Sequence, residues 1–452
     1  MNLKAKAWTI LFGILMVAGS CKKETKPIEI SPELYDASVD RVIEIMIHDI
    51  FSPPVASRIL AYPNVAAYEI IAQTDDKYQT LAGQLTDLTP IPVLDTTKNI
   101  NPKLSALIAH MALSKKLIFS EDRITTMQDS LYGVWKATNE DQFEASKAYG
   151  MKVVDHIAAW MNKDNYNQTR TMPKFTVNTE DPTRWQPTPP AYMDGIEPHW
   201  NDIRPFALDS AQQFKPLPPP NFSMDKESEF YKELKEVYDT GMKITQAGDE
   251  SEEMAIAKFW DCNPYVSVTR GHLMFATKKI SPGAHWIGIV KIANRKINSN
   301  FDDSVYAYTK TSIAIADAFI SCWDEKYRSN LIRPETLINQ HIDENWMPLL
   351  QTPPFPEYTS GHSVVSGAAA EVLTSIYGDN FSFDDDTETP YGLPVRSFTS
   401  FNQASAEAAI SRMYGGIHYR AAIEIGLKQG RDIGDFVIKK ITMKNPGALA
   451  SK

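Results

Sequence analysis

Apolar side chains recur three or four residues apart along most of the chain, which is the spacing of one face of an α-helix. The first such series begins near Pro32 and runs to Ile70. Sustained two-residue alternation, which strands need, is almost absent. The pattern predicts an all-α fold with bundle-like packing. Further predicted helices, rich in Ala, Leu, Met, Glu and Lys, cover 103–117, 121–137, 139–162, 224–245, 249–260, 283–297, 304–325, 362–377, 403–413 and 419–441.

One long stretch, between Met172 and Asn221, interrupts this helical pattern. It holds eleven prolines together with Trp185, Trp200 and Phe206. Proline cannot continue a helix, and the stretch is too aromatic for a free linker. We therefore predict a long belt packed over the surface of the bundle rather than a boundary between domains.

The N-terminus has the three parts of a secretory signal peptide. A basic start is followed by eleven mostly apolar residues, Trp8 to Ala18, and then by Gly19-Ser20-Cys21. Eleven residues are too few to span a bilayer as a permanent helix, so we expect residues 1–20 to be a signal peptide. A small-residue pair before a cysteine is typical of bacterial lipoproteins, in which Cys21 carries the lipid. We expect an exported protein anchored to the cell envelope, periplasmic or at the cell surface, with plain secretion as the alternative.

Composition limits the remaining possibilities. With 452 residues, 43% of them hydrophobic, the chain can bury a large core, and we expect a tether over 21–32 and a single all-α domain over 33–445. The net charge of −10 argues against a nucleic-acid partner, because no basic surface block is present. Cys262 and Cys322 are too few for a disulfide scaffold, so they are either buried free thiols or one disulfide.

Three short segments in the last third of the chain combine cations, a small-residue turn and two histidines. Any anion site in this acidic protein must be a local concentration of cations, and two arginines and a lysine of these segments can supply it. A guanidinium suits a tetrahedral anion because it can bind two oxygens at once. The segments are Lys326 to Pro334, Phe355 to His362 and Ser411 to His418, and the candidate anion-binding cations are Lys326, Arg333 and Arg412.

The second segment predicts a helix N-terminus at the anion. Ser360 offers a hydroxyl, and the backbone N–H of Gly361 can approach an oxyanion closely because no Cβ intervenes. Both residues precede an apolar helical run from Val364 to Ile376. An anion bound here would meet the positive end of a helix, so these parts together describe a pocket for a phosphate-shaped ion.

The third segment requires a break in its helix. Arg412 and His418 are six residues apart, about 600° around an ideal helix, and would point to different faces. Gly415-Gly416 lies between them and permits a break that lets both point inward. His418 could then bond to the central atom of the anion, with His362 as acid–base partner.

The order and spacing of these segments resemble a known signature. Lys, six residues, Arg-Pro, then Ser-Gly-His, then Ser-Arg, five residues, His, is similar to the three-part motif of vanadium-dependent haloperoxidases and type 2 phosphatidic acid phosphatases. The motif lies within 320–425, and the helical pattern with its proline-rich belt is similar to the haloperoxidases over most of the mature chain. The resemblance implies helical bundles of the vanadium haloperoxidase type.

The resemblance also implies a cofactor and roles for individual residues. Vanadate would be held by its oxygens, with His418 as axial ligand to vanadium and His362 as the acid–base residue. The metal would act as a Lewis acid that polarises hydrogen peroxide for attack by a halide, with help from Lys326. The residues implied to hold the oxygens are Lys326, Arg333, Ser360, Gly361 and Arg412.

Aromatic residues near the motif imply a halide pocket. Trp323 and Phe355 stand where the haloperoxidases can carry aromatics lining that pocket, and we expect Tyr265 to face it as well. An apolar wall would suit iodide, a large and weakly hydrated ion. The likeness to bacterial iodoperoxidases implies oxidation of iodide to hypoiodous acid.

The chain departs from the family pattern after His418, where the commonly found aspartate is missing from Tyr419-Arg420-Ala421-Ala422. A metal-bound imidazole normally donates its other N–H to an acceptor, so a backbone carbonyl or a remote carboxylate must substitute. Two alternatives stay open. One is an acid phosphatase with His418 as nucleophile, and the other is a non-catalytic surface lipoprotein that binds an oxyanion or a glycan.

Overall fold

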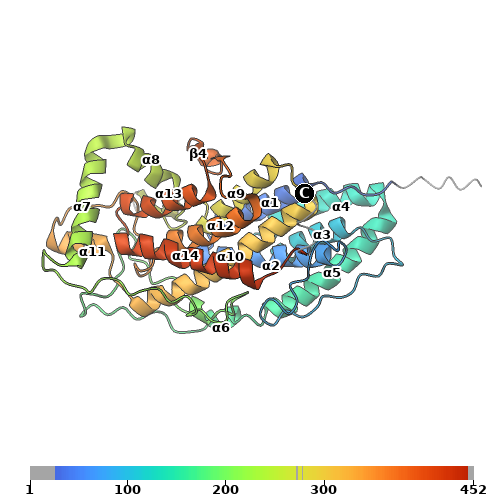
Figure 1. Cartoon of the computed structure of the whole chain (residues 1–452), viewed down its shortest axis with the longest axis horizontal. Helices are drawn as coiled ribbons and strands as arrows, with labels where there is room; N and C mark the ends of the chain where they lie inside the picture. Colours follow the sequence, from blue (N-terminus) through green and yellow to red (C-terminus); the bar gives the residue numbers. More distant parts are fainter. Residues whose placement is uncertain (1–25, 271–272, 277, 446–452) are drawn as a thin grey trace, which may run out of the picture.

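A computed structural model describes residues 26–270, 273–276 and 278–445 of the chain. The predicted signal peptide and Cys21 lie outside these residues. The described part contains fourteen α-helices and only two short pairs of strands, which confirms the all-α prediction. The molecule is elongated, with α3, α4 and α5 toward one end, α7, α8 and α11 toward the other, and α10, α12 and α14 between them (Figure 1).

The N-terminal helices begin where the sequence supplies caps. The side chain of Ser52 accepts from the N–H of Val55, and that of Asn101 accepts from the N–H of Leu104. A proline at the first helical position follows each cap, where its missing N–H costs nothing. The helices of this region are α1 (Pro32–Asp49), α2 (Pro53–Ala72), α3 (Pro102–Lys115), α4 (Glu121–Thr138), α5 (Glu140–Met161) and α6 (Tyr166–Thr169).

The second half holds eight helices, most of them close to the predicted ranges. The largest shift is at α7, which begins five residues later than the predicted 224 because Ser228 caps it by accepting from the N–H of Tyr231. The helices are α7 (Glu229–Ala247), α8 (Glu252–Phe259), α9 (Pro282–Lys296), α10 (Phe301–Ser329), α11 (Pro334–His341), α12 (Gly361–Tyr377), α13 (Phe401–Tyr414) and α14 (Arg420–Lys440).

Two antiparallel strand pairs and three 3₁₀ turns complete the described fold. The strands have only three or four residues each, so they leave no alternation to read in the sequence. β1 (Ser267–Arg270) pairs with β2 (Leu273–Ala276), and β3 (Phe383–Asp385) pairs with β4 (Arg396–Phe398). The turns are η1 (Trp200–Asp202), η2 (Gly248–Glu250) and η3 (Thr389–Tyr391).

The crossing of α12 and α14 is unusually close because glycines line it. A Cβ on Gly430 would lie 2.0 Å from the carbonyl oxygen of Val364, and one on Gly367 would lie 2.5 Å from that of Leu427. Both distances are far below van der Waals contact, so no other residue fits at either position without moving a helix. The crossing fixes the start of α12 against the C-terminal part of the chain.

The proline-rich belt packs on the bundle as predicted. Trp185, Trp200 and Phe206 are all buried. Asp317 of α10 accepts the backbone N–H groups of residues 206–208 at 2.7, 2.7 and 3.0 Å. Burial raises the pKa of this carboxyl to about 6. The belt is therefore attached to the long central helix by a buried side chain rather than tethered loosely.

The largest buried apolar cluster joins residues from Ile28 to Met443. Cys262 and Cys322 are both buried free thiols, which confirms one of the two interpretations of these residues. Among the helices of the described residues, none is long and apolar enough to cross a membrane.

Candidate active site

The second and third motif segments line one cavity, where α10 and α13 end and α12 begins, and the first segment lies directly behind the Phe355 ring of its wall. Its walls include the candidate residues Gly361, His362, Arg412 and His418. The remaining lining residues are mainly apolar: Pro53, Cys262, Asn263, Pro264, Pro282, Phe319, Trp323, Pro353, Phe355 and Ile417.

Three buried cations lie at this cavity. Arg412 lines it, whereas Lys326 and Arg333 lie behind its wall, with Nζ and Cζ 5.0 and 5.2 Å from the centroid of the Phe355 ring. Lys326 lies in the last turn of α10, Arg333 caps α11, and Arg412 lies in the last turn of α13, each at most 1% exposed. Within the described residues, none of the three forms a salt bridge with a carboxylate. Nζ of Lys326 donates to two carbonyl oxygens instead, those of Pro356 and Glu357, each at 3.0 Å. Burial lowers the pKa of this lysine to about 7, so a nearby anion would be needed to keep it charged.

Both guanidinium groups are only partly satisfied. Arg333 donates from Nε to the carbonyl of Phe355 at 3.0 Å and from Nη1 to that of Ile417 at 2.8 Å. Arg412 donates from Nη1 to the carbonyl of Trp260 at 2.6 Å. In the part of the chain that the structure describes, Nη2 of Arg333 and Nε of Arg412 are buried without a hydrogen-bond partner.

The N-terminus of α12 has the predicted form. Ser360 is its N-cap, and its hydroxyl accepts from the N–H of Ser363 at 3.3 Å. Gly361 is the first helical residue and lines the cavity. A Cβ at Gly361 would lie 3.5 Å from the Trp323 ring and 3.9 Å from Cε of Lys326, within the space that an anion would use. The helix therefore presents its positive end to the cavity.

The two glycines before His418 break the chain as the sequence predicts. α13 ends at Tyr414, Gly416 adopts a φ of 78°, and α14 begins at Arg420. A positive φ of this size is open to glycine at little cost. The break brings His418 back to the same cavity as Arg412.

Glu357 supplies the acceptor for His418 that the sequence left open. Its Oε1 lies 2.8 Å from Nδ1 of His418 and also accepts the backbone N–H of Tyr419 at 2.9 Å. With Nδ1–H donating to this carboxylate, Nε2 keeps its lone pair. In this structure that lone pair accepts from Nη1 of Arg333 at 3.1 Å, so a ligand bound to Nε2 would replace this hydrogen bond. Glu357 is therefore the remote carboxylate, one of the two predicted substitutes, and it accepts from His418 in place of the missing aspartate.

Burial and charge set the protonation of these groups. Burial, with Arg333, Lys326 and Arg412 nearby, lowers the pKa of His418 well below its ordinary value. Burial raises the pKa of Glu357, whereas Arg333, the N–H of Tyr419 and Lys326 oppose this shift and favour its carboxylate form. A neutral imidazole is the form that ligates a metal, so the cations favour the ligating state of His418.

His362 is placed for proton transfer. It is the second residue of α12 and lines the cavity. Within the described chain its Nε2 is buried without a hydrogen-bond partner. Burial, with Arg412 next in importance, lowers the pKa of its imidazole well below the ordinary value. An unpaired ring nitrogen of this kind can exchange a proton with a bound molecule.

The unpaired polar atoms around this cavity fit a tetrahedral oxyanion. Burying a donor without an acceptor costs about 1 to 3 kcal/mol, and native proteins rarely accept several such losses at one place. An anion with four oxygens would supply the missing acceptors, and the neutral His418 would face its central atom. The unpaired atoms are Nη2 of Arg333, Nε of Arg412, Nε2 of His362 and Oγ of Ser363.

Two of the three predicted halide-pocket aromatics line the cavity. The rings of Trp323 and Phe355 lie 5.0 Å apart, and Phe319, which the sequence did not single out, lies 5.5 Å from Trp323. The indole N–H of Trp323 donates to the carbonyl of Ile196 in the belt at 3.1 Å. Tyr265 is not among the lining residues, and its side chain instead hydrogen-bonds Ser52.

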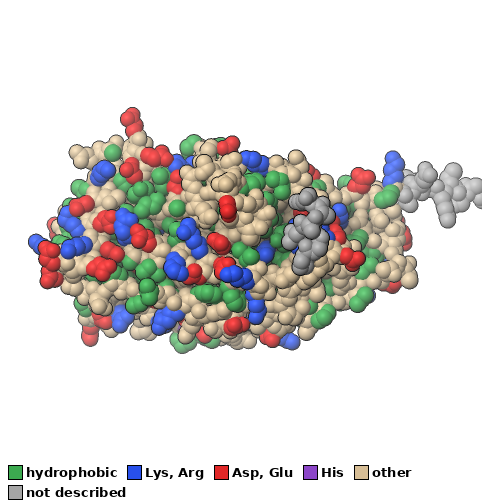
Figure 2. Space-filling view, viewed as in Figure 1, with side chains coloured by type: hydrophobic (Ala, Val, Ile, Leu, Met, Phe, Trp, Pro, Cys, Tyr) green, Lys and Arg blue, Asp and Glu red, His purple; other side chains and the backbone are tan. Residues whose placement is uncertain are grey.

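The cations at this site are hidden inside an acidic molecule. On the face drawn in Figure 2, basic and acidic side chains are interspersed rather than gathered into one patch. The buried lysine and arginines therefore form the local concentration of positive charge that the sequence predicts.

Comparison with known proteins identifies the family of this chain. Residues 339–446 match the family model described as the VCPO second helical-bundle domain. The chain is 27% identical to the vanadium chloroperoxidase of Curvularia inaequalis over 180 residues, which span only 29% of that protein.

Solved structures extend the likeness to nearly the whole chain. A structure described as the first bacterial vanadium-dependent iodoperoxidase is 71% identical, with a TM-score of 0.90, over 93% of this chain and 99% of that one. A holo-type bacterial vanadium-dependent chloroperoxidase, 15% identical with a TM-score of 0.61, covers 89% of this chain and 92% of its own, and shows the shared fold alone. This chain belongs to the vanadium-dependent haloperoxidases.

Proposed function

We propose that this protein uses vanadate to oxidise iodide with hydrogen peroxide, giving hypoiodous acid. The observation that carries the proposal is the group of buried, unpaired cationic and histidine nitrogens around one cavity. The 71% identity to an iodoperoxidase supports both the cofactor and the preferred halide.

The residues present fit vanadate. The oxygens would be held by the three cations and by the start of α12, and Nε2 of His418 would ligate vanadium. When bound, vanadate supplies a Lewis acid that activates hydrogen peroxide without changing its own oxidation state. The oxygen-binding residues are Lys326, Arg333, Ser360, Gly361 and Arg412.

The protein contributes orientation and proton transfer. Glu357 holds the His418 ring in place and accepts from its Nδ1–H. His362 accepts a proton from hydrogen peroxide at Nε2 and returns it to the leaving oxygen. Lys326 regains its charge beside the anion and draws electron density from the bound oxygens.

The apolar wall supports iodide as the substrate. Trp323, Phe355 and Phe319 offer no acceptors, and the ring edges and nearby cations favour an anion. Iodide loses less hydration energy than smaller halides when it enters a cavity with such a wall. The released hypoiodous acid diffuses freely, so no site for an organic substrate is required.

The phosphatase alternative gains one specific observation. The carboxylate bonded to His418 would also orient a nucleophilic histidine, and a phosphate would fit the same cations. The high identity to an iodoperoxidase favours oxidation, and the experiment below includes both assays.

The decisive experiment uses the chain that begins after Cys21. Oxidation of iodide and of bromide by hydrogen peroxide is measured before and after incubation with orthovanadate, together with hydrolysis of a phosphomonoester. We expect iodide oxidation that depends on vanadate. Hydrolysis without any halide oxidation would instead assign the protein to the phosphatases, and inactivity in both assays would favour a binding protein.

Two variants show whether any activity comes from this site. His418→Ala should lose vanadate-dependent oxidation by more than about 100-fold, because the ligand to the metal is removed. His110→Asn is the matched control, since His110 is also a buried histidine but lies in the N-terminal helices, where it hydrogen-bonds Ser38. Equal losses in both variants would contradict the proposed site.

We further propose that the protein is exported and held at the membrane by a lipid on Cys21. The support is the signal-like sequence before Gly19-Ser20-Cys21. Full-length protein expressed in a bacterium should be found with the membranes and take up labelled fatty acid. Cys21→Ala should abolish the labelling, and unlabelled wild-type protein would contradict the proposal.

A further inference from the structure

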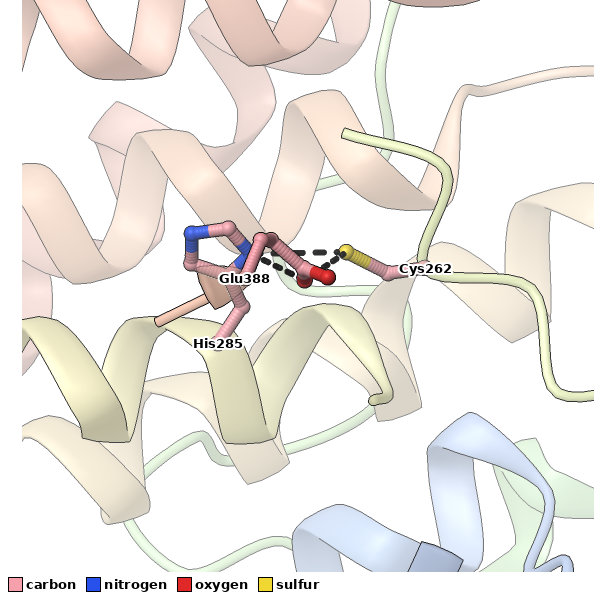
Figure 3. A group of neighbouring side chains, drawn as sticks. All are labelled: Cys262, His285 and Glu388. Carbon is pink, nitrogen blue, oxygen red and sulfur yellow. Dashed lines mark hydrogen bonds and ion pairs between the residues drawn. The ribbon is translucent and has the colours of Figure 1, made fainter. Parts of the chain in front are cut away.

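A second cluster of ligand-type side chains lies directly beside the cavity. Cys262 comes from the segment after α8, His285 from the first turn of α9, and Glu388 from the loop after β3. All three are buried and point toward one another, as Figure 3 shows. Three elements far apart in the sequence thus converge on one point.

The distances within the cluster match those between ligands of one metal ion. Nδ1 of His285 lies 3.3 Å from Oε1 of Glu388 and 3.5 Å from Sγ of Cys262, and the sulfur lies 4.0 Å from that oxygen. Metal–ligand bonds of about 2.0 to 2.3 Å at tetrahedral angles place neighbouring ligand atoms about 3.3 to 3.7 Å apart. Two distances agree with this range, and the third needs only a small closing movement.

The other nitrogen of His285 is already held as a metal-binding histidine requires. Nε2 lies 2.8 Å from Oδ2 of Asp385 and 2.8 Å from the hydroxyl of Thr387. Asp385 is fully buried, so this contact is shielded from solvent. A carboxylate on the far nitrogen fixes the ring and directs the lone pair of Nδ1 toward the metal.

We propose that Cys262, His285 and Glu388 bind a divalent transition-metal ion of the zinc class. The sulfur, nitrogen and oxygen donors are the set that such borderline ions accept, and three protein ligands leave the fourth position to water. Binding releases the thiol proton of Cys262 and the proton on Nδ1 of His285 to solvent, and the metal takes their place. This site is separate from the vanadate ligands and does not depend on the proposed peroxidase function.

The metal would stabilise the wall of the catalytic cavity. The Trp260 ring stacks on the His285 ring with centroids 4.5 Å apart. The carbonyl of Trp260 accepts from Arg412, and Cys262 itself lines the cavity. An ion can therefore reach the cluster through the cavity, and once bound it fixes the 260–262 segment that holds Arg412.

Cobalt(II) tests the site because a thiolate ligand gives it a charge-transfer absorption band. Vanadate-free protein is titrated with Co²⁺ alone, and Zn²⁺ is then added. We expect the band to saturate at one equivalent and to disappear as Zn²⁺ displaces the cobalt. Cys262→Ser should abolish the band, whereas Cys322→Ser, which removes the other buried thiol, should leave it unchanged.

A second pair of variants keeps the test valid if Cys262→Ser folds poorly. Asp385→Asn should weaken Co²⁺ affinity about 10- to 100-fold while keeping the band, because it disturbs the support of His285 and not a ligand. Glu388→Gln should weaken affinity at least as much. The proposal would be overturned if wild-type protein showed no thiolate band, or if the band persisted in Cys262→Ser. The cluster would then be a hydrogen-bonded network without a metal.

Discussion

The two halves of this molecule bury arginines in opposite circumstances. In the N-terminal helices, Nε of Arg58 donates to Asp164 at 2.6 Å, and the guanidinium lies 4.3 Å from the centroid of the Tyr166 ring. Around the cavity, Arg333 and Arg412 are buried just as deeply but have no carboxylate partner among the described residues. The charge of Arg58 is neutralised by a carboxylate of the protein. The charges of Arg333 and Arg412 are left to be neutralised by a bound anion.

The difference distinguishes structural polar groups from functional ones. Asp164 also accepts from the hydroxyl of Tyr62 at 2.9 Å, so the N-terminal group is complete without a ligand. A buried cation without a counter-ion destabilises the fold unless an anion binds. Single unpaired polar atoms are buried elsewhere too, so the anion site is located by the clustering of unpaired cationic and histidine nitrogens at one cavity.

The largest effect on stability should come from removing Arg58, the arginine that is paired with a carboxylate. Arg58→Met leaves the buried Asp164 without its cation, which costs about 3 to 5 kcal/mol of the free energy of unfolding. Urea denaturation of the vanadate-free protein measures the loss. Vanadate affinity of the folded protein should stay unchanged. A loss below about 1 kcal/mol would show that the pair does not stabilise the N-terminal helices.

The next effect concerns the carboxylate that supports His418. Glu357→Gln keeps an oxygen to accept from Nδ1–H but removes the charge, and we expect vanadate affinity to fall about 10- to 100-fold. Equilibrium binding of vanadate, followed by the recovery of activity, provides the measurement. Glu69→Gln, which changes a buried carboxyl of α2 in the N-terminal half, is the control. Unchanged affinity in Glu357→Gln would remove this residue from the site.

A buried histidine of the N-terminal region should make stability depend on acid. Burial lowers the pKa of His110 to about 3, from an ordinary 6.5 that the unfolded chain retains. Between these values the unfolded state binds more protons, so stability falls with decreasing pH by up to about 1.4 kcal/mol per unit.

Removing this histidine should flatten that dependence. Unfolding midpoints measured from about pH 7 to 4 should fall less steeply in His110→Asn than in the wild type, because the group that takes up the proton is gone. His341→Gln, at an exposed histidine, should behave as the wild type does. Parallel plots of the unfolding midpoint against pH for wild type and His110→Asn would show that protonation of His110 does not cause the loss of stability.

The smallest effect should have the opposite sign. Arg412→Met removes a buried charge whose Nε is unpaired, so the vanadate-free protein should be as stable as wild type or more stable by about 1 kcal/mol. The same variant should lose vanadate-induced stabilisation. Paired denaturation curves with and without vanadate show both results. Marked destabilisation without vanadate would mean that Arg412 is structural, like Arg58.

Much of this arrangement could be predicted because it is local in the sequence. Helical spacing is set by neighbours three and four residues apart, so most helices were placed within a few residues. The anion-binding residues come from short motifs, and the break at Gly415-Gly416 follows from glycine conformation.

What could not be predicted depends on long-range convergence. Glu357 lies inside the second motif, yet its contact with His418 spans 61 residues and leaves no spacing signal. The cluster of Cys262, His285 and Glu388 joins segments 23 and 126 residues from the cysteine. The sequence did carry a signal for Glu357. It lies between Phe355 and Ser360, two predicted site residues that would be buried, and a carboxylate is seldom buried without a partner.

The glycine crossing of α12 and α14 has a consequence for how this sequence can change over time. Gly367 and Gly430 touch no ligand, yet each faces a backbone atom that no side chain could clear. Selection at these positions would therefore be as strict as at a catalytic residue. Among diverged descendants of this chain, both glycines would stay unchanged while the surface around them varied. Their conservation would reflect the close packing of two helices and not a role in the reaction.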